Sequence, residues 1–167
     1  ALGGLQSGNL VPTIGASFTN NTGGTITSLD IAYRGEQWRL GTAARVDRLD
    51  FQYSTNATSL ATGTWTDVNQ LDFTAPVTAI PLGLLDGNAA ANRTAISFTI
   101  TGLNIAPGAT FYIRWNSFDG TGADDGLAVD DFSLTPQGTS GGPTLLSIND
   151  VSQAEGNAGT TNFTFTV

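Results

Sequence analysis

The stretch ISFTITGLNIAPGATFYIRW, residues 96–115, decides the fold class. Apolar side chains occupy every second position of its first part, residues 96–100, and again of its last part, residues 111–115. Between these parts, Pro107 and Gly108 are typical of a turn. An alternation with a period of two places the apolar side chains on one face of a β-strand and does not fit a helix. The stretch therefore predicts two strands joined by a turn.

The same alternation recurs along the chain, and no helical period is sustained anywhere. Further strands are expected near residues 14–18, 29–33, 49–53, 65–68 and 127–134. The apolar positions shift by one residue at Asp130 and Asp131, as they do across a β-bulge. Gly35 is expected to bend or bulge its strand, and residues 82–93 to form a long loop with one helical turn. Roughly eight short strands separated by turns predict an all-β fold, an antiparallel β-sandwich of jelly-roll type.

Composition shifts divide the chain into three parts. The jelly-roll β-sandwich is expected over residues 1–135, and residues 136–144 are a linker because Pro, Gly, Ser and Thr dominate them. Residues 145–167 predict a C-terminal extension of one or two strands, in which apolar residues again alternate with Asn and Thr. The apolar positions of the last strand are Phe163, Phe165 and Val167. Because a lone hairpin is only marginally stable in water, these strands are expected to need partners.

Charge and composition narrow the classes of function. Only 12% of the residues are charged and the formal net charge is −8, which disfavours nucleic acid and anionic membranes as partners. The chain contains no His, Cys or Lys, so the usual general base and the usual zinc ligands are missing, and we expect no enzyme. No apolar stretch is long enough for membrane insertion. A surface rich in Thr, Asn and Gly is common in extracellular β-proteins, so the expected location is secreted or at the cell surface.

The acidic, glycine-rich segment of residues 119–131 is the first candidate site. Glycine lets a loop fold so that carboxylates and carbonyls converge, and calcium binds six to eight such oxygens. The candidate calcium ligands are Asp119, Asp124, Asp125 and Asp130. Two other interpretations stay open: a solvated loop whose Asp side chains cap turns, and a catalytic pair of carboxylates.

Trp38 is the candidate ligand-binding residue. It lies between Glu36 and Arg39, and planar and polar groups of this kind occur together on saccharide-binding faces. The alternative is that Trp38, like Trp65 and Trp115, packs in the core or at its rim. The arginines between residues 34 and 48 are expected to pair with the carboxylates among them.

Two segments resemble known families. The stretches IGASFTNNTGGTITSLDIAYRGEQWR, LDFQYSTNATSLATGTWTDV, FYIRW and DDGLAVDDFSL resemble bacterial extracellular jelly-roll modules related to MAM domains and carbohydrate-binding modules. Residues 145–167, LLSINDVSQAEGNAGTTNFTFTV, resemble the start of a Calx-β domain. The resemblance implies a place in a larger secreted protein, and it implies a structural calcium ion near the final strand, at Asp130 or its neighbour.

Three functions follow as hypotheses. The leading one is an extracellular structural or adhesive module, a fibre subunit whose strand with Phe163, Phe165 and Val167 is donated head-to-tail to the next copy. Self-association is then expected. The alternative is a calcium-stabilised carbohydrate-binding module of a larger secreted protein, which binds a glycan through Trp38. The third is a calcium-dependent spacer that stiffens a long surface protein.

Overall fold

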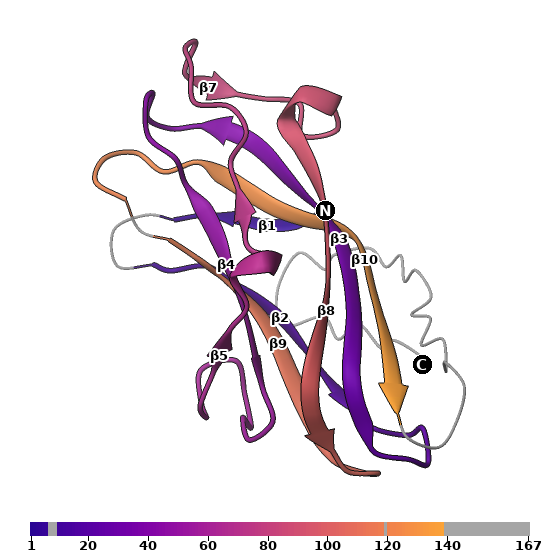
Figure 1. Ribbon diagram of the computed structural model, residues 1–167. Coiled ribbons are helices and arrows are strands. Elements are labelled where there is room, and N and C mark those ends of the chain that lie inside the picture. Colours follow the sequence, from indigo (N-terminus) through magenta and orange to yellow (C-terminus); the bar gives the residue numbers. More distant parts are fainter. Residues whose placement is uncertain (7–9, 119, 139–167) are drawn as a thin grey trace, which may run out of the picture.

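A computed structural model describes residues 1–6, 10–118 and 120–138, which form two antiparallel sheets packed as a sandwich (Figure 1). The first sheet has the order β1 (Leu2–Leu5), β10 (Gly126–Gly138) and β3 (Ile26–Leu40), and the far edge of β3 is shared by β7 (Gly83–Leu84) and β8 (Arg93–Ile105). The second sheet has the order β2 (Thr13–Thr19), β9 (Thr110–Ser117) and β4 (Arg48–Ser54), with β5 (Thr66–Asp67) and β6 (Phe73–Thr74) at the far edge of β4. The predicted all-β sandwich is confirmed.

The core lies between the two sheets and consists of the alternating apolar side chains. Leu29, Ile31 and Tyr33 of β3 face Phe111, Ile113 and Trp115 of β9, and each of the six is at most 4% exposed. The indole of Trp115 makes edge-on contacts with the rings of Tyr33 and Phe51, at 5.2 and 5.1 Å between centroids. A buried side chain of this size stabilises the fold by about 1.5–3 kcal/mol. Trp115 therefore has the packing role that its place on a strand predicted.

No bulge interrupts β3 at Gly35, where the sequence predicted a bend or a bulge. β3 continues through Gly35, which pairs with Val129 of β10 and with Thr94 of β8. The reason for glycine is close packing between the sheets: a Cβ atom at this position would overlap the ring of Phe73. Glycine here allows the second sheet to approach β3.

The bulge predicted at Asp130 and Asp131 is confirmed. Asp130 pairs with Arg34 and Ser133 pairs with Ala32, so β10 has one residue more than β3 in this interval. Asp131 has a φ of 49°, in the left-handed region that a bulge residue adopts.

β10 ends at Gly138, so the first three residues of the predicted linker, 136–138, belong to this strand. Pro136 pairs with Leu29 of β3, although proline has no N–H to donate. β1 covers only Gly126–Val129 of β10, so the rest of β10 lies at a sheet edge, where proline is tolerated. Residues 139–167, which hold most of the predicted linker and the partial Calx-β-like strands, lie outside the described residues.

Two short 3₁₀ helices interrupt the connections between strands. η1 (Asn69–Leu71) lies between β5 and β6, and η2 (Ala90–Asn92) precedes β8. η2 is the helical turn predicted within residues 82–93, a segment that otherwise contributes to a sheet only the two residues of β7 and the first residue of β8. Among the described residues, no helix is long and apolar enough to cross a membrane.

Candidate functional site

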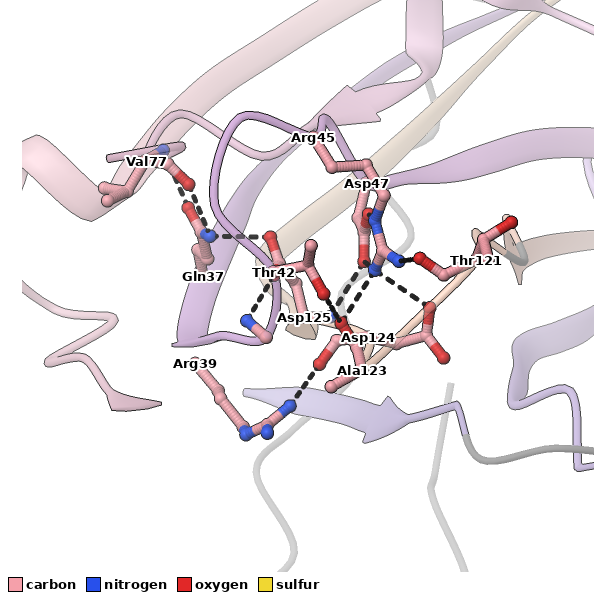
Figure 2. A network of polar contacts seen from close by, with 11 residues as sticks. Gln37, Arg39, Thr42, Arg45, Asp47, Val77, Thr121, Ala123, Asp124 and Asp125 are labelled. Carbon is pink, nitrogen blue, oxygen red and sulfur yellow. Dashed lines mark hydrogen bonds and ion pairs between the residues drawn. The ribbon is translucent and has the colours of Figure 1, made fainter. Parts of the chain in front are cut away.

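Asp124 and Asp125 lie in the loop before β10, against residues 41–47 of the loop after β3 (Figure 2). Both residues are buried, at 6% and 3% exposed. The sequence predicted that these carboxylates converge on a ligand. Their partners are instead groups of the protein itself.

Arg45 is the centre of this region. Its guanidinium forms a paired contact with both carboxylate oxygens of Asp47, at 2.6 and 2.7 Å. It also donates to the backbone oxygens of Thr121 and Ala123, at 2.6 and 2.9 Å, and to Oδ1 of Asp124, at 3.0 Å. The hydrogen bond with Asp47 raises the pKa of Arg45, so the guanidinium stays charged. Carboxylate and carbonyl oxygens are the ligands that calcium takes. Here such oxygens surround the guanidinium of Arg45 instead.

Asp125 links three segments of the chain. Its Oδ1 accepts the N–H of Gly41 at 2.7 Å, and its Oδ2 accepts a hydrogen from Nε2 of Gln37 at 2.7 Å. The Gln37 side chain also makes two hydrogen bonds with the backbone of Val77, at 2.8 and 2.9 Å. Burial raises the pKa of Asp125, and the hydrogen bond from Gly41 opposes this shift. The carboxylate thus fastens the loops to one another.

The predicted calcium ligands do not come together in the described part of the chain. No three acidic side chains there are placed to hold one metal ion, and Asp119 lies outside it. Asp130 is on β10, at the bulge, where its Oδ1 accepts the N–H of Asp131 at 2.9 Å. Since the oxygens of Asp125 and Oδ1 of Asp124 already accept hydrogen bonds, the described residues do not fit a calcium ion. Calcium binding stays a prediction from the sequence.

Trp38 lines a groove of about 490 Å³ on the outer face of the first sheet. The indole is 36% exposed, its Nε1 donates to Oε2 of Glu36 at 3.0 Å, and the backbone of Gly87 packs against the ring. Residues from four strands build the groove: Gly3, Leu5, Trp38, Leu84, Gly126 and Ala128. Trp38 therefore packs at a rim and also presents part of its ring to the groove, which combines the two alternatives open for it.

Leu84 was not among the candidate residues of the sequence analysis, whereas Glu36 was noted there as a polar neighbour of Trp38. Leu84 is 93% exposed and stands beside Trp38, while Glu36 is 1% exposed and fixes the indole. The signal for Leu84 was present, because Leu82 and Leu84 alternate as in a strand, but the pattern does not tell an exposed leucine from a core leucine.

The predicted pairing of the arginines between residues 34 and 48 with the carboxylates among them is confirmed for Arg45 and Arg48. Arg45 pairs with Asp47, and Arg48 pairs with Asp50 across one intervening residue. Arg34 pairs with Asp131 of the bulge, at 3.0 Å. Trp65 takes another role, since the guanidinium of Arg114 stacks on its ring at 3.9 Å.

The edges of the sheets are the second candidate for function. β8 pairs with β3, and in the part of the chain that the structure describes its other edge has no strand partner. The same holds for β2, which pairs with β9 alone. Phe98 of β8 lies opposite Ile31 of β3 and so faces the core, yet it is 38% exposed whereas Ile31 is 2% exposed. Phe163, Phe165 and Val167, the predicted assembly strand, lie outside the described residues.

A scan against family models and searches of curated proteins and of solved structures found no match to this chain.

Proposed function

We propose that this chain is a non-catalytic structural or adhesive module of a secreted or cell-surface protein, and that it associates through the edges of its sheets. The observation that carries this proposal is the open edge of β8, with the core-facing Phe98 38% exposed. An unpaired edge presents a row of backbone N–H and C=O groups, and another strand can satisfy them. Only 12% of the residues are charged, which supports the proposal, because charged side chains are one means by which proteins prevent edge strands from pairing.

The donated strand is the specific form of this function. Residues 162–167 alternate apolar and polar side chains, and each large apolar side chain gains about 1.5–3 kcal/mol when it leaves water. Donation to another copy joins two different surfaces, so it propagates head-to-tail as a filament.

The test is the mass of the full chain in solution as a function of concentration, by light scattering, together with electron microscopy. The proposal expects species larger than a monomer that grow with concentration. Replacing both Phe163 and Phe165 with Asp is expected to remove filaments, while Phe163→Leu with Phe165→Leu, the matched control, keeps them. A chain that stays monomeric at millimolar concentration contradicts the proposal, and filaments that persist in the Asp variant contradict strand donation.

A second candidate function is carbohydrate binding, and the groove at Trp38 favours it. An aromatic ring fixed by Glu36 gives an apolar surface on which a sugar ring can stack, next to polar groups. A glycan array with the wild type and with Trp38→Ala tests this function, and Trp65→Ala is the control because Trp65 stacks on Arg114 instead. Binding that only Trp38→Ala abolishes supports it, and a wild type that binds no glycan contradicts it.

A further inference from the structure

We infer that the open edge of β8 pairs with β8 of a second copy of this chain, in antiparallel orientation about a two-fold axis at Phe98. This inference goes beyond the proposed function, because it concerns a symmetric contact that needs no donated strand. It rests on a comparison of three open edges, those of β10, β2 and β8, and on the pattern of side chains along β8.

The open part of β10 is protected against pairing. Beyond the residues that β1 covers, it has two charged residues, Asp130 and Asp131, and a bulge that interrupts the regular edge. Pro136 follows, and it cannot donate a backbone hydrogen bond. Charge, bulge and proline are the devices by which native proteins keep an edge strand unpaired.

The open edge of β2 has no charged residue, but it exposes less apolar surface. β2 has seven residues, against thirteen in β8. Its aromatic residue, Phe18, is 8% exposed and stacks on Phe111 at 5.4 Å. Less apolar surface is therefore gained when this edge is covered.

From Thr94 to Thr101, β8 has none of the protective devices of β10, and its irregular pairing with β3 lies beyond this stretch, between Thr101 and Ile105. From Thr94 to Ile105 it contains no charged residue and no proline. Its core-facing residues are Ile96, Phe98 and Ile100, which pair with Tyr33, Ile31 and Leu29 of β3. On the opposite side of the sandwich η1 lies near β8, and the neighbouring β5 and β6 have two residues each. Phe98 thus stays 38% exposed, although its position in the sheet faces the core.

The sequence around Phe98 is chemically symmetric, and this identifies the partner as a second copy. Ile96 and Ile100 flank it at two residues, and Ser97 and Thr99 flank it at one. In an antiparallel pair centred on Phe98, Ile96 lies opposite Ile100 of the second copy, and Ser97 lies opposite Thr99. Apolar side chains then meet apolar ones on the core face, and hydroxyls meet hydroxyls on the outer face, as favoured cross-strand pairs do.

The charge of the whole chain supports the same partner. Two copies carry a formal net charge of −8 each and repel one another where their charged surfaces meet. The stretch Thr94–Ile105 is free of charge, so this contact brings no like charges into opposition. The pairing joins the first sheets of two copies into one continuous sheet and uses up both edges, so it closes as a dimer.

Cysteine cross-linking tests the contact directly, because the chain contains no Cys. The full chain is prepared as Ser97→Cys and, with a tag of different mass, as Thr99→Cys, which both leave Phe98 in place. Residues directly opposite in a strand pair have Cα atoms close enough for a disulfide, whereas residues 97 and 97 of two copies are displaced along the strands. We expect a mixed disulfide dimer from the two variants together and loss of this product in either variant alone. Ser17→Cys on β2 is the matched control at another edge.

The light-scattering mass of Phe98→Lys and of Thr99→Lys gives a second readout. Both variants place a charge at the edge, and Thr99→Lys does so on the exposed face, where the fold itself tolerates it. A shift of either variant from dimer to monomer supports the inference. Cross-linking that is equal in all combinations, or absent from the mixture of Ser97→Cys and Thr99→Cys, overturns the inference. Loss of the dimer in the double variant Phe163→Asp with Phe165→Asp also overturns it, since the tail then occupies β8. A wild type that is monomeric overturns the proposed function as well, whereas assembly without the mixed disulfide overturns the inference alone.

Discussion

The loops around Arg45 and the outer edge of β8 differ in how their polar groups are partnered. Around Arg45, the carboxylates and carbonyls that resemble a ligand site receive hydrogen bonds from Arg45, Gly41 and Gln37. Along β8, a sequence that reads as an ordinary core strand leaves one edge without a partner in the described part of the chain. The comparison shows that residue type alone does not mark a functional surface. What marks it is whether the groups found there are already satisfied.

The largest expected effect is that of Arg45→Ala on stability. The substitution leaves Asp47 and Asp124, which are 4% and 6% exposed, without their cation. Breaking a buried ion pair by removing one partner costs about 3–5 kcal/mol. Urea unfolding is the measurement, and Arg48→Ala is the matched control, because its pair with Asp50 is exposed and is worth less than about 1 kcal/mol. Equal losses of unfolding free energy in both variants would show that the contacts of Arg45 stabilise the fold no more than an exposed ion pair does.

Asp125→Ala is expected to cost about 2 kcal/mol, because the N–H of Gly41 and the amide of Gln37 lose a buried acceptor. Asp125→Asn tests the charge separately. Burial raises the pKa of Asp125, so the contribution of this group to stability is largest at acid pH and is lost as the pH rises through that raised pKa.

The stability of the wild type should therefore fall, relative to Asp125→Asn, as the pH rises from about 4 toward neutrality. Urea unfolding of both proteins across this range is the measurement. A difference that does not change with pH would contradict a raised pKa in the folded state.

Phe98→Thr is expected to change stability by less than about 1.5 kcal/mol, since Phe98 is already partly exposed and Thr suits a strand. The same substitution should lower the tendency to associate, because it removes the apolar surface at the open edge. Urea unfolding at low concentration and light scattering at high concentration separate the two effects. A large loss of stability with unchanged association would show that Phe98 acts as a core residue and not as a surface for association.

The smallest expected effect is that of calcium on the melting temperature. Because the guanidinium of Arg45 already lies among the carboxylate and carbonyl oxygens of these loops, we expect equal melting curves in EDTA and in millimolar calcium. A site filled at a hundredfold excess over its Kd would add about 2.7 kcal/mol, which is several degrees for a domain of this size. Such a rise would instead support the calcium site predicted from the acidic segment, with Asp119 among its ligands, and Asp119→Asn would then remove it.

The sequence by itself determined the features that depend on near neighbours in the chain. The period of two predicted the strands, and the phase shift at Asp130 and Asp131 predicted the bulge. Each of these follows from the local geometry of an extended chain, in which side chains two residues apart lie on the same face.

The tertiary structure decided which distant groups meet. Gly35 reads as a bend or a bulge in the sequence, and only the fold shows that its lack of a side chain makes room for Phe73, which comes from the other sheet. Asp124 and Asp125 read as metal ligands, and only the fold brings Arg45, Gly41 and Gln37 to their oxygens from an earlier loop and strand. Likewise, the alternation in β8 specifies a strand but not its place at an edge. Periodicity is a local property, whereas the partner of a buried charge or of a strand edge is set by the order in which the sheets pair, and that order is encoded by the whole chain.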